Sequence, residues 1–300
     1  MNTRKLGLSA LLIASTAWPV AHAADGQQGA NILALGGASV ADPEDNTTLL
    51  SNPAMLGMTP RYDFSGSFFL QPDLDHGWNL NAVDSSKGIV AFGAGWERGI
   101  TNPPLTDEEL PGWVRPGVEP TNLRRTSLFT AAFSITPKDR KFSFGVSGTM
   151  GTSKHDRLGK QLTGELGVGL GWRPSEVLTL GLAGRDLLPT TSAASEPASV
   201  LAGLRYGIEE GPSFTMDAGW QLEDHNGLGL QLKMGAEAAF GIARPRLGYA
   251  YDGPLRQSHI TAGFGGENDA GAVDLGVDLP VGGEADLSDT RIMLSVRLRT

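Results

Sequence analysis

The sequence contains no cysteine, no excess of positive charge and no long hydrophobic run after its first residues. Without cysteine there is no disulfide framework, no thiolate metal site and no cysteine nucleophile. Lysine and arginine number 24 against 33 aspartate and glutamate, and they do not cluster, so the basic face that a nucleic-acid-binding protein needs is missing. No window after residue 23 stays apolar over the ~18 residues of a spanning helix, which argues against such a helix.

The sequence also lacks an arrangement typical of catalysis. His22 lies near the start of the chain, and His76, His155 and His225 fall in expected loops. Ser258-His259 lies in an expected strand, where neighbouring side chains point to opposite faces, so the two cannot form a dyad. We therefore predict a protein that is not an enzyme and that uses no cofactor and no metal.

Residues 1–23 have the features of a secretory signal peptide. Arg4 and Lys5 give a positive start, residues 6–20 are mostly apolar, and Ala21-His22-Ala23 has the small-x-small form of a cleavage site. The alternative is an N-terminal anchor helix, but the apolar stretch is short and interrupted. We expect a Sec-type export signal and a Gram-negative bacterial source.

The rest of the chain alternates between apolar and polar residues with unusual regularity. In residues 290–299 every second side chain is apolar, and arginine occupies three of the positions between. Period 2 predicts a strand with one apolar and one polar face. Most segments have the ~9–12 residues that a tilted strand needs to cross a bilayer. About fourteen segments follow this pattern: 62–70, 77–85, 88–98, 124–135, 141–152, 161–173, 177–186, 198–207, 213–222, 228–239, 243–252, 257–265, 270–279 and 289–299.

Such strands fit either a soluble sandwich, whose apolar faces form the core, or a membrane barrel, whose apolar face meets lipid. Outer-membrane barrels combine short periplasmic turns with longer outer loops. One set of expected connections is short, and the other includes the long stretches 99–123, 153–160, 187–197 and 280–288. We therefore predict an all-β transmembrane antiparallel barrel in the bacterial outer membrane, surrounded by lipid. A secreted soluble β-protein remains the alternative.

In such a barrel the polar face of each strand lines the lumen. Charges of both signs on that face predict ion pairs that tie the wall together or partly plug it. Glycine, with 41 of 300 residues, often recurs at alternate strand positions, where it eases curvature and leaves space inside. The lumen charges that we expect are Glu165, Arg185, Arg205, Asp217, Lys233, Glu237, Arg246, Asp274 and Arg291, together with His259, Asp278 and Arg297.

Residues 24–60 do not alternate, and they are too apolar for an exposed tail. Residues 29–40 are small and apolar and include Gly36-Gly37, residues 42–45 form an acidic turn, and Asn52-Pro53-Ala54 follows. We therefore expect a plug folded into the lumen.

This order of elements resembles the hatch of the FadL-type long-chain fatty-acid transporters and of the related PorV-like outer-membrane proteins. Residues 172–187 and the run Arg246-Leu247-Gly248-Tyr249 resemble strands that recur in the same superfamily. The resemblance implies a fourteen-stranded barrel over residues 61–300, with an N-terminal hatch inside it. The hatch residues that it implies are Gly36, Gly37, Asn52, Pro53 and Ala54.

The resemblance implies two functions. The first is passive transport of small hydrophobic molecules such as fatty acids through the outer membrane. The second, from the PorV-like relatives, is a plugged barrel that anchors or binds a protein of the secretion or surface machinery. In the transporter family an early strand is kinked and opens the wall sideways. Gly93 and Gly95 either mark a similar lateral exit or only relieve crowding against the hatch.

Overall fold

The structure is a computed structural model that describes residues 28–71, 76–101, 124–155, 159–188, 198–208, 211–222, 229–253, 256–282 and 290–300. The expected signal peptide and most of the long loop at 99–123 lie outside the described residues.

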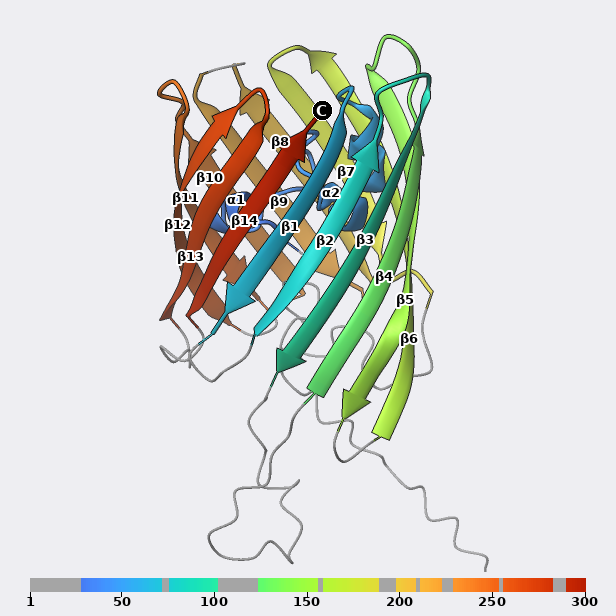
Figure 1. Cartoon of the computed structure of the whole chain (residues 1–300), viewed down its shortest axis with the longest axis vertical. Helices are drawn as coiled ribbons and strands as arrows, with labels where there is room; N and C mark the ends of the chain where they lie inside the picture. The colour runs from blue at the N-terminus through green and yellow to red at the C-terminus, as the bar shows by residue number, and fades with distance from the viewer. Residues whose placement is uncertain are drawn as a thin grey trace, which may run out of the picture.

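Fourteen antiparallel strands form one closed barrel in which each strand pairs with its sequence neighbours and β1 pairs with β14 (Figure 1). The predicted all-β barrel is confirmed, and each predicted segment coincides with one strand to within three residues at either end. The strands are β1 (Tyr62–Leu70), β2 (His76–Asp84), β3 (Val90–Thr101), β4 (Arg124–Ile135), β5 (Phe142–His155), β6 (Gly159–Ser175), β7 (Leu178–Arg185), β8 (Ser199–Gly207), β9 (Ser213–Gln221), β10 (Leu230–Glu237), β11 (Ala243–Asp252), β12 (Gln257–Asn268), β13 (Gly271–Gly282) and β14 (Arg291–Arg299).

The two faces of the wall follow the alternation in the sequence. On β1, Phe64 and Phe68 point outward and are about half exposed, while Asp63 and Ser67 point inward and are buried. Phenylalanine, leucine, isoleucine and tryptophan dominate the outer face, and serine, threonine, asparagine and charged residues dominate the inner one. A closed barrel with an apolar outside and a polar inside suits lipid around it, and this distribution argues against a secreted soluble β-protein.

The connections fall into two sets. At the end of the barrel that holds the C-terminus they span residues 85–89, 136–141, 176–177, 208–212, 238–242 and 269–270, and we call this the short-turn end. The opposite end carries the longer connections, including residues 102–123 and 186–198, and we call it the long-loop end. Strands β3–β6 have 12 to 17 residues, whereas β7–β10 have 8 or 9, so β5 and β6 extend further at the long-loop end (Figure 1).

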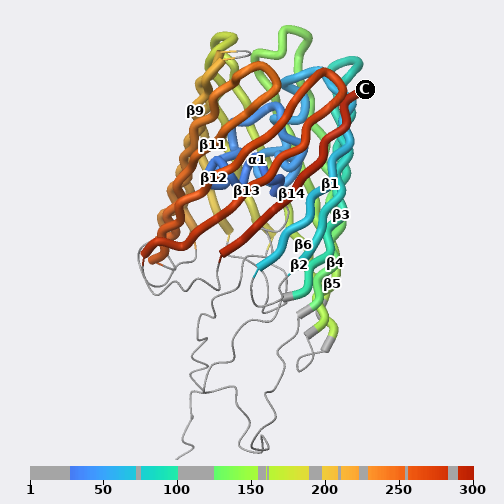
Figure 2. Tube along the Cα trace, turned by 60° about the vertical axis from the view of Figure 1, so that its left-hand side comes forward, coloured from blue at the N-terminus to red at the C-terminus, as the bar shows by residue number. Residues whose placement is uncertain are grey.

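The N-terminal segment, residues 28–60, lies inside the barrel (Figure 2). It contains α1 (Ala30–Ala34), α2 (Thr48–Ser51) and the short 3-10 helix η2 (Pro53–Gly57). Most of its residues are buried against inward-facing side chains of the wall. Among the residues that the structure describes, no helix is both long and apolar enough to cross a membrane.

Local sequence explains how the N-terminal segment turns within a narrow space. Helix α1 ends where Gly36 takes a positive φ of 71°, with the Gly37 amide donating to Ile32 O at 2.9 Å and the Gly36 amide donating to Leu33 O at 3.1 Å. This is the Schellman ending, which favours glycine because it has no Cβ. At the start of η2, the Asn52 side chain accepts from the Ala54 amide, and Pro53 occupies the first helical position.

Candidate functional site

A series of inward-facing glycines gives the N-terminal segment its place in the lumen. A Cβ on Gly181 would lie 2.2 Å from the Val40 carbonyl oxygen, and one on Gly145 would lie 2.4 Å from the Ala54 amide nitrogen. Real Cβ atoms do not approach so closely, so only glycine lets the segment lie directly on the wall. We call this set the glycine belt; it comprises Gly145, Gly169, Gly171, Gly181, Gly203, Gly235, Gly248, Gly263 and Gly276.

The segment follows the wall in reverse strand order. Helix α1 contacts β11–β14, the stretch that follows it runs past β10 to β7, and η2 contacts β3–β6. Glycine therefore recurs at one level around most of the barrel because a backbone passes there. This explains why the glycine excess of the sequence lies within strands.

The predicted hatch residues all lie in this segment, inside the wall. Besides capping α1, Gly36 donates its amide to Thr261 Oγ1 on β12 at 2.9 Å, and a Cβ on Gly36 would lie 2.5 Å from the Tyr249 carbonyl oxygen. Gly37 has a φ of 79° and lies next to Lys233. Pro53 and Ala54 rest on Gly145 of β5. The structure therefore places these residues at the contacts between segment and wall.

Asn52 and Asp217 bind the backbone of Val40 from two sides. Asp217, inward on β9, accepts hydrogen bonds from the amides of Ser39 at 2.6 Å and Val40 at 2.9 Å. Asn52 Nδ2 donates to Val40 O at 2.7 Å and to Leu170 O of β6 at 3.1 Å. Strands β6 and β9 are thus connected through the backbone of Val40 and the side chain of Asn52.

Arginines hold the segment at the short-turn end. Arg61 donates to the carbonyl oxygens of Pro43 and Asp45, and Arg297 donates to Glu44 O at 2.9 Å. Further along the segment, Arg140 donates to Gly57 O and Arg173 donates to Met58 O. Arginine suits this role because its planar fork carries several donors and stays charged.

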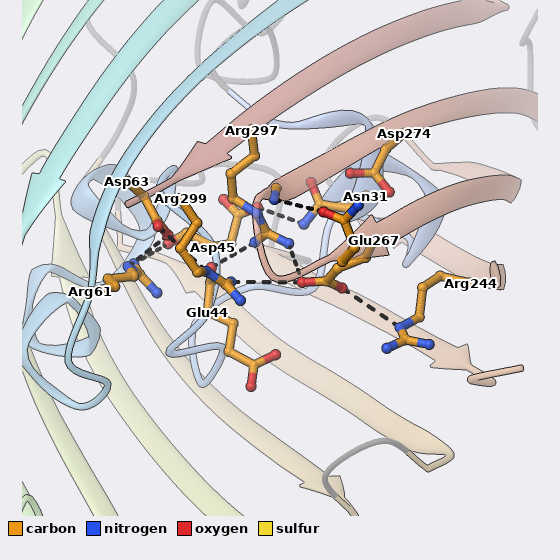
Figure 3. Close-up of polar contacts among 12 residues, drawn as sticks. Asn31, Glu44, Asp45, Arg61, Asp63, Arg244, Glu267, Asp274, Arg297 and Arg299 are labelled. Atoms are coloured by element: carbon orange, nitrogen blue, oxygen red, sulfur yellow. Dashed lines mark hydrogen bonds and ion pairs between the residues drawn. The ribbon is translucent and has the colours of Figure 1, made fainter. Parts of the chain in front are cut away.

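Figure 3 shows how two of these arginines, Arg61 and Arg297, are themselves paired with carboxylates. Glu267 of β12 accepts from Arg297 Nη2 at 2.9 Å and lies 3.6 Å from both Arg244 Nε and Arg299 Nη2. Asp63 lies 3.5 Å from both Arg61 Nε and Arg299 Nε. These carboxylates and guanidinium groups therefore form one network beside the segment at the short-turn end, which we call the arginine rim. Of these residues the sequence analysis identified Arg297 alone.

Arg205 of β8 binds two acidic residues of the segment, Asp42 and Glu44, the latter at 2.9 Å. The Arg205 guanidinium holds the pKa of the Glu44 carboxyl below its usual value. Burial raises the pKa of the Asp42 carboxyl, against the opposing effect of Arg205. The acidic turn predicted at residues 42–45 therefore faces a cation of the wall.

The predicted lumen charges all project inward by their place in the strand alternation. Arg246 Nε contacts Glu237 at 2.5 Å, and Arg246 Nη1 contacts Asp274 at 2.6 Å, which forms a buried group across β10, β11 and β13. His259 Nδ1 lies 2.9 Å from Asp278. The remaining members lie apart from this group, toward the long-loop end or at mid-depth: Glu165, Arg185, Lys233 and Arg291.

Gly93 and Gly95 lie on a strand that is paired along its length. The register of β3 with β2 and β4 runs without a shift. A Cβ on Gly93 would lie 3.2 Å from Leu56 Cδ1, so Gly93 makes room for the segment. A Cβ on Gly95 would lie 2.6 Å from Asn81 Oδ1 of β2 and 3.4 Å from Leu49 Cδ1, so Gly95 makes room first for a wall side chain. Register shifts occur between other strands, within β6–β7 and β12–β13.

The space left inside the barrel is small. A cavity of about 30 Å³ lies between the segment and β7–β10, and one of about 10 Å³ lies beside β1 and β14. A benzene-sized guest needs a cavity of about 150 Å³. Neither of these two cavities therefore has room for a molecule of that size.

The fold is similar to that of several solved structures. The toluene transporter TodX of P. putida matches with a TM-score of 0.64 over 91% of this chain and 96% of that chain, at 15% identity. The toluene transporter TbuX of Ralstonia pickettii gives 0.61 over 91% and 97%, at 13% identity, and the monoaromatic hydrocarbon channel CymD gives 0.60 over 90% and 96%, at 12% identity. This chain has the FadL-type fold.

The predicted resemblance to FadL-type barrels is thus confirmed at the level of fold. No protein-family model matches the sequence. No curated protein matches it either.

Proposed function

We propose that this FadL-type barrel is an outer-membrane channel through which small hydrophobic molecules pass down their gradient. The N-terminal segment acts as its hatch, with Gly36, Gly37, Asn52, Pro53 and Ala54 at its contacts with the wall. The observation that carries the proposal is a lipid-facing barrel whose lumen is filled by a segment of its own chain. Such a segment has to give way for cargo, so it is suited to control passage.

The similar solved structures guide the choice of cargo. Two of them are described as toluene transporters and one as a monoaromatic hydrocarbon channel. We therefore propose monoaromatic compounds as the first cargo class to test, with long-chain fatty acids as the second.

The test is uptake by vesicles whose outer leaflet contains lipopolysaccharide, because phospholipid alone is permeable to small apolar molecules. Purified barrel is inserted, and entry of labelled toluene and of labelled oleate is compared with entry into empty vesicles. Saturable uptake above the empty-vesicle rate supports the channel. Uptake equal to that of empty vesicles, from a barrel shown by its heat-modifiable gel mobility to be folded, contradicts it.

The filled lumen also favours a second candidate, the PorV-like plugged barrel that anchors or binds a secretion or surface protein. Its test is purification from the native membrane with and without a chemical cross-linker. A stoichiometric protein partner, together with absent uptake, would support this candidate over the channel.

A further inference from the structure

The N-terminal segment is held in two different ways along its length. Its two ends are held largely by apolar contacts. Helix α1 buries Ala30 and Leu33 against Phe69 and Met293, and the last part buries Leu49 and Leu56 in a cluster with β2–β4 side chains. Between them, the middle stretch, which we define as residues 38–47, has one small apolar cluster, of Val40 with Ala183 and Leu201, and is otherwise held by hydrogen bonds and ion pairs.

The middle stretch is also the partition between the two halves of the lumen along β7–β10. The larger cavity lies on its long-loop side and is lined by Arg185, Leu201, Lys233 and Asp217. On its other side, Glu44 is more than half exposed at the short-turn end.

Two buried polar atoms beside this cavity lack partners among the described residues. These are Asp217 Oδ1 and Ser51 Oγ. A buried carboxylate oxygen without a partner is costly unless water or a polar ligand group reaches it. The cavity has room for about two water molecules, each needing roughly 10–15 Å³. The seam between the middle stretch and β7–β10 is therefore polar and suited to water.

The two kinds of contact differ in what is lost when they break. A hydrogen bond or ion pair exchanges partners with water when its groups separate into a hydrated lumen, so its net contribution is small. Apolar side chains that separate in water regain no such partner. The middle stretch is therefore the part of the segment that can leave its wall most readily. Its neighbours α1 and residues 49–58 stay in place.

We propose that cargo crosses between the middle stretch and strands β7–β10, past Asp217. The wall there is mixed, with Leu201 and the glycine belt beside Asp217, Lys233 and Arg185, so the route takes small amphipathic molecules that carry a hydrogen-bonding group. This inference rests on the proposed function and locates its route. It differs from a lateral exit at Gly93 and Gly95, where the segment is held by apolar contacts.

Because the sequence has no cysteine, two introduced cysteines can form a disulfide only with each other within the chain. Val40→Cys with Gly203→Cys places two Cβ atoms 2.8 Å apart, closer than the ~3.8 Å of a disulfide, so the middle stretch must shift slightly from β8 to admit the pair. Leu49→Cys with Gly93→Cys places two Cβ atoms 3.5 Å apart, close to the disulfide value. The first pair ties the middle stretch to β8, and the second ties the apolar end to β3. Each variant is compared in its oxidised and reduced forms, so effects of the substitutions themselves cancel.

We expect oxidation of the Val40–Gly203 pair to reduce benzyl alcohol uptake to the empty-vesicle rate, and reduction to restore it. Oxidation of the Leu49–Gly93 pair should leave uptake at its reduced level. Unchanged uptake with the first disulfide closed, or loss with the second alone, overturns the route. If the unmodified barrel takes up nothing, the proposed function fails and the route fails with it.

Two further experiments test the route if a cysteine variant does not insert into the vesicles. Asp217→Ala removes both hydrogen bonds to the middle stretch and should raise uptake, whereas Thr215→Val, two residues away on the same face, should not. Barrel-dependent uptake of benzyl alcohol should exceed that of toluene. An unchanged rate in Asp217→Ala would overturn the route, and a preference for toluene would overturn the cargo class.

Discussion

The two halves of the wall from β3 to β10 hold the same segment by different physics. Strands β3–β6 are long and meet Leu49, Met55 and Leu56, which are all fully buried. Strands β7–β10 are short and meet the segment through Asp217, Arg205 and the backbone, with one small apolar cluster around Val40. The first half is suited to permanent attachment and the second to release. A segment that must both close a lumen and open it needs one contact of each kind.

The largest expected effect comes from removing the apolar attachment. Leu49→Ala with Leu56→Ala leaves cavities in a closed cluster, and each truncation should lower the free energy of unfolding by about 2–5 kcal/mol. Guanidinium unfolding in detergent micelles, followed by tryptophan fluorescence, measures this. The matched control is Leu170→Ala with Leu182→Ala, paired neighbours on the lipid-facing side. An equal loss in the control would contradict the distinction between inner and outer apolar contacts.

Arg246→Met tests the buried ion-pair group across β10, β11 and β13, which lies beside the polar half. The substitution keeps much of the side-chain volume but leaves Glu237 and Asp274 buried without their cation. Breaking a buried pair in this way should cost about 3–5 kcal/mol in the same unfolding assay. Arg244→Met, whose contact with Glu267 is longer at 3.6 Å, serves as the control with a smaller loss. Equal losses of unfolding free energy in the two variants would mean that the buried ion pairs of Arg246 stabilise the barrel no more than the longer Arg244–Glu267 contact does.

A smaller effect is expected from filling the glycine belt. Gly181→Ala puts a Cβ 2.2 Å from the Val40 carbonyl oxygen, which is backbone and cannot simply turn away. Overpacking of this kind should cost about 1–3 kcal/mol and shift the middle stretch from β7. Gly148→Ala, where a Cβ meets nothing within 4 Å, should leave stability unchanged. The temperature at which the folded barrel loses its faster gel mobility measures the stability of each variant. An equal decrease of this temperature in both variants would show that the loss comes from the strand propensity of glycine and alanine, and not from the contact with Val40.

The wall could be predicted from sequence because lipid and lumen impose opposite demands on alternate residues. Phe64 and Ser67 lie on opposite faces for that reason, and the same parity placed Arg246 and Asp274 inward before their pairing was seen. The hatch residues came from a resemblance, and the structure places all of them at the segment's contacts with the wall.

The arginine rim could not be predicted in the same way. Arg61 and Arg140 lie outside the strands, where no alternation assigns a direction, and Arg61, Arg140 and Arg173 bind backbone carbonyl oxygens, which carry no sequence signal. Which belt glycine meets which residue of the segment is likewise set by the path of the chain in space.

The smallest expected effect concerns Glu44, the most exposed contact of the polar half. Its pKa is lowered by Arg205, so its contribution to stability is complete above its ordinary value of 4.5 and is lost as the pH falls through the lowered value. Because Glu44 is more than half exposed, Glu44→Gln should cost less than about 1 kcal/mol at neutral pH. The groups that act on it are Arg205, Arg297, Arg61 and Arg299.

The difference in thermal midpoint between the unmodified protein and Glu44→Gln should therefore narrow on acidification from pH 7 to pH 3. High salt at pH 7 should narrow it as well, since an exposed ion pair is screened. A difference that stays constant with pH and salt would mean that the Glu44 carboxylate contributes nothing to holding the middle stretch. The polar half would then depend on Asp217 and the backbone carbonyl contacts alone, and release would require breaking those.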